Sequence, residues 1–264
     1  MSLALVGGAA DVRGDARAGD ATGGGFAGDA ATVFATLRDT GRSAGLAEAL
    51  AAAADLVVAG SVPFGPAGHA VVAGRTLASA SGWWRAGCWG PDVDELGVAV
   101  LGRIDLPGGA IATLQLSAQC VADTADTSDT ADTAGSCVRT AGTGTAPWLT
   151  ALAAARLGVS EALRDTCRAY LARRRVGQGV ALHQQLVRAD LARAAIAHEE
   201  AAAVLAAASG RELRTALRLH RSVSDADGLL APLLGGSGYL LGSAGHVADV
   251  SHLVADAYCP AARS

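Results

Sequence analysis

The sequence predicts a mainly α-helical protein with a small β-rich segment, in which a reduced β domain precedes a C-terminal antiparallel helical bundle. Half of the residues are apolar (51%) but only 4% are aromatic, so alanine and leucine provide most of the apolar surface and favour closely packed helices. The last part of the chain keeps a helical spacing of apolar positions. A middle stretch instead breaks into short apolar runs separated by glycine and proline, which indicates strands.

The N-terminal part divides into a tail and a short helical segment. Residues 1–30 are rich in glycine, aspartate and alanine and predict a flexible tail, because they have little to bury. Residues 31–54 have helical character, with Gly41 and Gly45 as breakers, which predicts two short helices or one interrupted helix. The start lacks the basic segment of a signal peptide, and no apolar run reaches about 18 residues, so we expect a cytoplasmic protein that spans no membrane.

Residues 55–121 are predicted to form a β-rich domain. Its apolar runs are residues 56–58, 70–72, 97–101 and 111–114. Four prolines fall between these runs, where a missing N–H does no harm: Pro63, Pro66, Pro91 and Pro107. This spacing favours strands with tight connections, and therefore a small β-barrel or sandwich.

Residues 122–146 contain a repeat of alanine or serine, aspartate and threonine. Regularly spaced aspartates can indicate calcium, but this stretch lacks the central glycine and closing glutamate of a calcium loop. A low-complexity linker is the better interpretation. The five cysteines are scattered without a C-x-x-C pair, so we expect no metal site. Net charge is −4 and the one dense basic cluster is Arg173–Arg175, which is too short for a nucleic-acid-binding surface.

Residues 147–264 are predicted to form the helical bundle. Expected helices cover about 148–175, 182–208, 212–221 and 245–258, and another begins near residue 225. A turn at Gly177 and Gly179 separates the first two helices, and Gly235–Gly238 interrupts the helix that begins near residue 225. Short loops between long helices imply antiparallel neighbours.

Three motifs in this bundle resemble those of the acyl-CoA dehydrogenase family. The run from Arg173 to Gln184 is similar to the family pattern R-x-x-F-G-x-x-[ILV]-x-x-x-Q, and Leu191-Ala192 follows at the family's spacing. Residues 234–239, LGGSGY, match the L-G-G-x-G-Y loop, and residues 255–257 stand where R-D-A is found. The order of these motifs is also that of the family, which implies its C-terminal helical fold.

The resemblance implies flavin chemistry. Members of the family remove a proton and a hydride from adjacent carbons of an acyl thioester, and FAD, bound at a subunit interface, accepts the hydride. By position, the cofactor candidates are Arg173, Gly177, Gln184, Gly235, Gly236 and Gly238. An arginine offers a planar fork of donors to diphosphate oxygens, and glycines let backbone N–H groups approach a phosphate. The alternative is that Arg173 only complements a helix C-terminus and that the glycines only end helices.

Several positions depart from the family pattern. The family's catalytic glutamate occurs at one of two places, and here Trp148 occupies one while the other, around Tyr258, holds no glutamate. Val176 replaces the phenylalanine of the R-x-x-F-G motif, and Pro232 replaces the glutamine that the family has before the glycine pair. His252 replaces the arginine of the last helix. The large N-terminal helical domain is missing or reduced to residues 31–54. No catalytic residue is therefore assigned.

Four other polar residues are weighed as catalysts and set aside. His183 and His252 are possible substitute bases, but we interpret them as interface or partly buried polar residues. Glu199 and Glu200 fall within an alanine-rich helix and are interpreted as a solvated face or subunit contact.

The sequence leaves three functional hypotheses. In the first, the chain is a reduced subunit that pairs with itself or with a full-length acyl-CoA dehydrogenase subunit and meets its FAD and acyl thioester. In the second, it is a flavin-free helical dimerisation or scaffold module without redox activity. In the third, it is a standalone flavoenzyme with a base other than a carboxylate.

Overall fold

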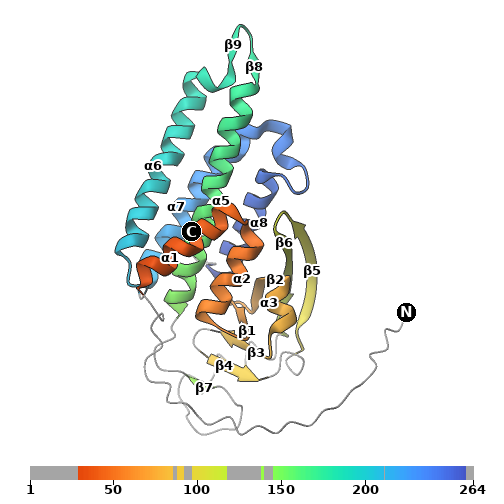
Figure 1. Cartoon of the computed structure of the whole chain (residues 1–264). Coiled ribbons are helices and arrows are strands. Elements are labelled where there is room, and N and C mark those ends of the chain that lie inside the picture. The colour runs from red at the N-terminus through yellow and green to blue at the C-terminus, as the bar shows by residue number, and fades with distance from the viewer. Residues whose placement is uncertain are drawn as a thin grey trace, which may run out of the picture.

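The computed structural model describes residues 29–85, 88–91, 97–117, 138–139, 145–210 and 212–259. Residues 1–28 of the predicted tail and nearly all of the predicted low-complexity linker lie outside these residues. Figure 1 shows a bundle of long helices standing on a smaller β part, with the first two helices packed alongside. The predicted fold class, mainly α with a small β-rich segment, is confirmed.

The bundle contains α5 (Thr145–Arg173), α6 (Gln185–Ala207), α7 (Leu213–Leu230) and α8 (Ala244–Tyr258), with the 3-10 segment η4 (Ala231–Tyr239) between the last two. The predicted break between residues 221 and 225 is wrong, because α7 runs through it. Buried side chains continue across that stretch at helical spacing, and they are Leu219, Val223, Ala226 and Leu230. One unbroken apolar stripe therefore supports one helix.

The N-terminal pair is α1 (Ala30–Ser43) and α2 (Leu46–Val57). Asp29 caps α1 by accepting a hydrogen bond from the Ala31 N–H. Gly45 separates the helices with a φ of 92°, a left-handed conformation that favours glycine. The predicted strand at residues 56–58 is wrong, because the alanine-rich α2 extends to Val57.

The β part consists of two small sheets and a short helix. One sheet has the order β1-β3-β4-β7: β1 (Ser61–Phe64), β3 (Gly82–Arg85), β4 (Cys88–Pro91) and β7 (Val138–Arg139). The other has the order β2-β6-β5: β2 (His69–Ala73), β6 (Gly109–Gln115) and β5 (Ala99–Leu106), and α3 (Gly74–Ser79) follows β2. Val62, Phe64, Val72 and Leu114 belong to one buried apolar layer that both sheets share, in agreement with the predicted sandwich.

Two of the four prolines do not lie between strands. Pro63 is inside β1 and Pro91 ends β4. The prediction that all four fall in connections is therefore wrong. Proline is tolerated inside β1 because that strand is at the edge of its sheet and needs hydrogen bonds on one side only.

Helices α1 and α5 cross at backbone contact. A Cβ built on Gly158 would overlap the carbonyl oxygen of Arg38, and one on Gly41 would overlap the carbonyl oxygen of Ala155. The Arg38 guanidinium also forms a two-pronged ion pair with Glu161, with contacts of 2.5 and 3.0 Å, and Glu161 is only 1% exposed. Two glycines and a partly buried ion pair therefore fix α1 on the bundle.

The helical bundle and the β part share one apolar cluster. Trp84 of β3, Trp148 of α5 and Tyr258 of α8 form an aromatic row, with ring centroids 6.3 and 5.5 Å apart and edge-to-face geometry. The Tyr258 hydroxyl donates to backbone oxygen and also accepts from the Val71 N–H at 3.2 Å. This buried tyrosine thus joins the last helix to strand β2.

Candidate functional site

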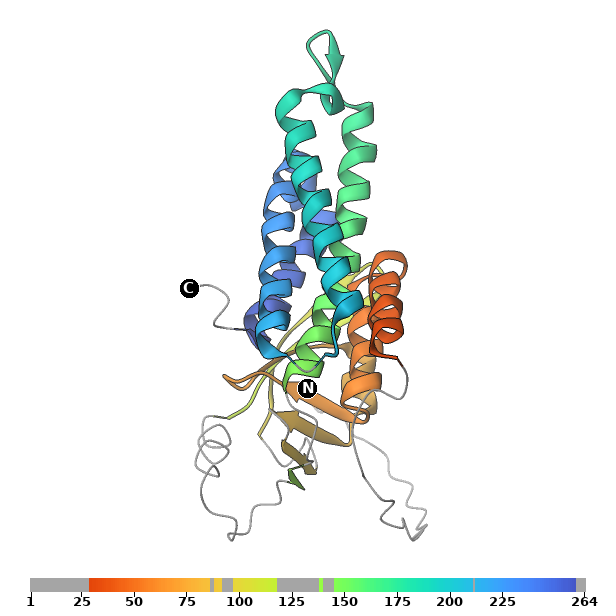
Figure 2. The same ribbon diagram turned by 90° about the vertical axis from the view of Figure 1, so that its left-hand side faces the viewer.

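A β-hairpin extends α5 at the end of the bundle. Its strands are β8 (Arg175–Val176) and β9 (Gly179–Val180), with Gly177 at a φ of 58° in the turn. Figure 2 shows the hairpin projecting beyond the helices, at the end farthest from the sheets. The predicted turn at Gly177 and Gly179 is therefore present and takes this form.

The glycine loop predicted to approach a phosphate lies in η4. Gly235 has φ 55° and ψ −145°, a conformation that only glycine adopts without strain. A Cβ on Gly236 would meet nothing within 4 Å, so its backbone is open to solvent. Gly238 is buried, and its carbonyl accepts a hydrogen bond of 2.7 Å from the Ser243 hydroxyl that caps α8. The end of the loop is thus anchored while its middle stays exposed.

Arg174 is the arginine that lies beside this loop. A Cβ on Gly235 would be 3.3 Å from Arg174 Nη1, so the guanidinium lies close against this glycine. Arg174 Nη1 also donates to the Tyr170 hydroxyl at 2.9 Å, and its guanidinium lies 5.7 Å from the centre of the Tyr170 ring. The residue that the sequence singled out, Arg173, lines a shallow depression together with Arg174 and Tyr170.

The structure brings some of the predicted site residues together and leaves others apart. Arg173 is the exposed last residue of α5, next to the arginine that touches Gly235. Gly177 has no atom within 4 Å of its Cβ position, and Gln184 is exposed at the start of α6. Hairpin and loop therefore share one end of the bundle, but Gly177 does not touch the loop.

This end of the bundle has the character of an anion site. Within the described residues, no carboxylate lies within 4.0 Å of a guanidinium of Arg173, Arg174 or Arg175. The neighbouring Gly235–Gly236 backbone carries no side chain that would block a phosphate. Exposed guanidinium groups are donors that suit phosphate oxygens, so the residues present are compatible with a diphosphate group.

The resemblance gives two places for a catalytic glutamate, and in this chain they hold Trp148 and the segment around Tyr258. Trp148 is 1% and Tyr258 2% exposed, and the two rings pack against each other. Burial raises the pKa of Tyr258 above its ordinary value, so its hydroxyl stays protonated. These positions have become part of the core.

Sequence reasoning missed a buried polar network between the bundle helices. Arg156, 0% exposed, donates through Nε to Ser251 Oγ and through Nη2 to Ser224 Oγ, both at 2.9 Å. Its Nη1 lies 2.9 Å from His220 Nδ1, while His220 Nε2 lies 2.9 Å from the Leu149 carbonyl. Nε2 therefore carries the hydrogen and Nδ1 accepts from the arginine. Burial, followed by the charge of Arg156, lowers the pKa of His220 to about 3.

A second buried polar cluster surrounds a carboxylate. Ser160 Oγ donates to Asp227 Oδ1 at 2.5 Å and lies 2.8 Å from His198 Nε2. The second oxygen of Asp227 lies 3.4 Å from Nε2 of His252, which is partly exposed. Burial, followed by the charge of Arg164, lowers the pKa of His198.

These residue types occur in hydrolytic triads, but their order here differs. Ser160 lies between the histidine and the aspartate and is 1% exposed, so no substrate reaches its oxygen. The cluster instead joins α5, α6, α7 and α8. The sequence signal that could have found it and the Arg156 network is the placement of Arg156 and Ser160 in a stretch of the helix rich in alanine and leucine.

The other candidate residues and cavities offer no clear chemistry. His183, Glu199 and Glu200 are exposed. A cleft of about 380 Å³ lies between the α1–α2 turn, the β5–β6 turn and α5, and its lining includes seven small residues: Gly41, Ser43, Ala44, Gly45, Gly108, Gly242 and Ala244. The one charged side chain in its lining, Arg42, is paired with Asp165 at 2.6 Å. Among the described residues, no histidine, cysteine or carboxylate cluster is arranged to hold a metal, and none of the helices is long and apolar enough to cross a membrane.

Comparisons with known proteins give matches among solved structures only. No protein-family model matches the chain, and no curated protein is similar to it. The solved structures that resemble it are acyl-CoA dehydrogenases. A variant of the Tcur3481-Tcur3483 steroid ACAD is 17% identical, with 71% of this chain and 54% of that chain covered and a TM-score of 0.47.

Two further structures give similar values. Glutaryl-CoA dehydrogenase from Mycobacterium smegmatis, in complex with FADH2, is 15% identical over 67% of this chain and 50% of that chain, with a TM-score of 0.47. The ChsE4-ChsE5 complex from Mycobacterium tuberculosis is 19% identical over 72% of this chain and 54% of that chain, with a TM-score of 0.46. The chain thus spans about half the length of these structures, and at such identities and TM-scores the likeness carries no information about chemistry.

Proposed function

We propose that this chain is an acyl-CoA dehydrogenase-like protein that acts as a reduced subunit. It presents the end of α5 and the Gly235–Gly238 loop to the diphosphate of an FAD that a partner subunit holds, and it supplies no base of its own. The observation that carries the proposal is the Arg174 guanidinium beside Gly235, at a loop whose sequence matches the family motif.

The charge and shape of this end of the bundle support the proposal. Arg173, Arg174 and Arg175 are consecutive exposed arginines, of which Arg174 lies against the glycine loop, and no carboxylate among the described residues pairs with them. Guanidinium groups bind diphosphate oxygens in a bidentate manner, and the attraction is strongest where no other anion competes. Arg174 replaces Arg173 as the residue closest to the loop, because its side chain is held there by Tyr170.

The proposal that this chain supplies no base rests on the residues at Trp148 and around Tyr258. Trp148 stands at one place where a base is expected, and the segment Tyr258–Cys259 at the other holds no glutamate, so this chain offers no carboxylate at either place to take a proton from an acyl thioester. FAD, when bound, supplies the capacity to accept a hydride. We propose that the partner, a full-length acyl-CoA dehydrogenase subunit, provides the remaining contacts to it, in the cytoplasm.

The second candidate function is a flavin-free dimerisation or scaffold module. It is favoured by the outer surface of α6, where Leu186 and Ile196 are 80% and 59% exposed. Large apolar side chains on an exposed helix often mark a protein contact. In this case the arginine cluster would be a solvated surface with no cofactor.

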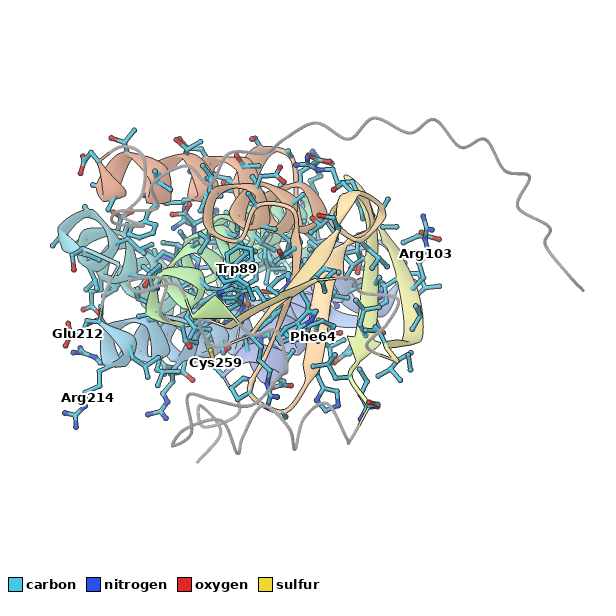
Figure 3. The ribbon with its side chains drawn as sticks, turned by 90° about the horizontal axis from the view of Figure 1, so that it is seen from below. Phe64, Trp89, Arg103, Glu212, Arg214 and Cys259 are labelled. Atoms are coloured by element: carbon cyan, nitrogen blue, oxygen red, sulfur yellow. The ribbon has the colours of Figure 1, made fainter. Side chains whose placement is uncertain are left out.

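The visible spectrum of bound flavin separates these functions. The full chain is purified alone and together with an acyl-CoA dehydrogenase encoded beside it, and FAD content is measured after gel filtration. We expect flavin only in the mixture, and a loss of about tenfold or more in flavin content for the R173A/R174A double variant, because two charge-assisted contacts disappear. Arg214→Ala is the matched control, since Arg214 is an exposed arginine at the other end of the bundle (Figure 3).

Each outcome points to one function. Flavin retention that is unchanged in R173A/R174A contradicts the proposal. Flavin bound to the chain alone favours a standalone flavoenzyme. A complex without flavin, or no complex and no flavin, favours the scaffold function.

A further inference from the structure

The outer edge of β5 has no partner strand within the described residues. β5 pairs with β6 on one side only, because it ends the sheet order β2-β6-β5. Figure 3 shows Arg103 of this strand at the outer rim of the molecule, pointing away from the helices. Val100 and Leu101 are 63% and 57% exposed. An open edge with exposed apolar side chains is a template for a further strand.

Few of the usual protective features are present on this edge. The strand contains no proline, and the chain contains no lysine. A register irregularity between Val100 and Gly102 distorts the beginning of β5, as a β-bulge does. The pairing with β6 is regular from Gly102 to Leu106, so this is the segment with an extended edge free to bond.

Arg103 and Asp105 make this segment complementary to itself. Their side chains are 72% and 88% exposed on the same face of the strand, with Nε and Oδ1 3.6 Å apart. If two copies pair antiparallel and centred on Ile104, each arginine lies opposite the aspartate of the other copy. A pairing centred on Arg103 or on Asp105 places like charges opposite each other, which is destabilising. Among these three antiparallel pairings, the charges therefore favour the one centred on Ile104.

We propose that β5 pairs with β5 of a second copy of this chain, antiparallel and centred on Ile104. The two three-stranded sheets then join into one continuous sheet across a two-fold axis. Leu101 comes to lie opposite Pro107 of the partner subunit, which removes an exposed leucine from water. The missing N–H of that proline is harmless, because it falls at the margin of the paired segment. This dimer is independent of the flavin contact proposed above, since it uses the β part.

Charge reversal and charge exchange test the register directly. Sedimentation velocity of the full chain over a range of concentrations gives the dissociation constant of the dimer. Arg103→Asp and Asp105→Arg each turn two attractive pairs into two repulsive ones, so each single variant is expected to weaken the dimer about ten- to thirtyfold. The R103D/D105R exchange restores opposite charges across the axis and is expected to return affinity to within about threefold of the original.

Arg214→Asp, on the opposite side of the molecule from Arg103 (Figure 3), controls for the change in net charge and is expected to leave the dissociation constant unchanged. Both edge residues are highly exposed, so the variants are expected to fold, and circular dichroism verifies it. A chain that is monomeric at every concentration overturns the proposal. The proposal is also overturned if the single charge reversals do not weaken the dimer, or if the R103D/D105R exchange does not restore its affinity. Flavin content plays no part in this measurement, so its outcome is separate from that of the proposed function.

Discussion

Substituting alanine for Gly158 tests whether backbone contact between α1 and α5 holds the N-terminal helices in place. The new Cβ would overlap the Arg38 carbonyl oxygen and lie 2.8 Å from both the Arg38 carbonyl carbon and the Arg42 nitrogen, where ordinary contacts are 3.4–4 Å. All of these are backbone atoms, so no side-chain rotation relieves the overlap. The helices must separate, which also strains the ion pair between Arg38 and Glu161.

The magnitude follows from two opposing effects. Alanine improves helix propensity by about 1 kcal/mol relative to glycine. Overpacking lowers the free energy of unfolding by about 1–3 kcal/mol, and by more when the backbone cannot move. If α1 is displaced, Phe34 and Leu37 also lose part of their burial, which lowers it further. We expect Gly158→Ala to lower the free energy of unfolding by about 2 kcal/mol or more, which corresponds to a fall in Tm of about 4–8 °C for a chain of this size.

Gly228→Ala provides the matched control. Gly228 lies within the helix α7, is exposed, and has nothing within 4 Å of its Cβ position. The same substitution is expected to stabilise the protein there by about 0.5–1 kcal/mol. Urea unfolding followed by far-ultraviolet circular dichroism measures both. If Gly158→Ala stabilises the chain as Gly228→Ala does, α1 does not pack on α5 in this way.

Three further changes probe the buried polar groups. Tyr258→Phe removes the hydroxyl that bonds to Val71 and is expected to cost about 1–3 kcal/mol in urea unfolding; an unchanged midpoint would refute the link. Arg156→Ala leaves a cavity and unpaired acceptors and is expected to cost about 3–5 kcal/mol in the same assay, whereas a cost under about 1 kcal/mol would show that the network is dispensable. His198 and His220 have folded-state pKa values below the unfolded value of about 6.5, so unfolding takes up protons. Stability should fall as pH drops below about 6.5, by up to about 1.4 kcal/mol per pH unit for each histidine, and urea midpoints that stay flat from pH 7.5 to 5 would contradict this.

The parts of the fold that depend on local pattern were predictable. The spacing of apolar residues predicted the long helices of the bundle. Gly45 indicated the division between the two N-terminal helices, and Gly177 indicated the turn after α5. The break expected near residue 222 was wrong because serine and aspartate favour turns in isolation, whereas burial of Val223 and Ala226 holds those residues in α7.

The candidate site was predictable only as a set of positions. The motifs located the arginine cluster and the glycine loop, but no local pattern distinguishes Arg174 from Arg173. The difference depends on which side chain meets Gly235, a contact between distant parts of the chain. The Arg156 network was missed for the same reason, because its hydrogen-bond partner Ser251 lies 95 residues further along the chain.

The shared core constrains the order in which the chain folds during synthesis. Phe34 of α1 and Tyr258 of α8 belong to the same buried cluster, which also includes Trp84 and Trp148. Contacts between residues so far apart in the chain require closure of a very long loop, which slows folding. On a ribosome the early helices and strands would expose their apolar faces until α8 emerges, and the core closes only then. We therefore expect the nascent chain to expose apolar surface for most of its synthesis, and such surface is what chaperones bind.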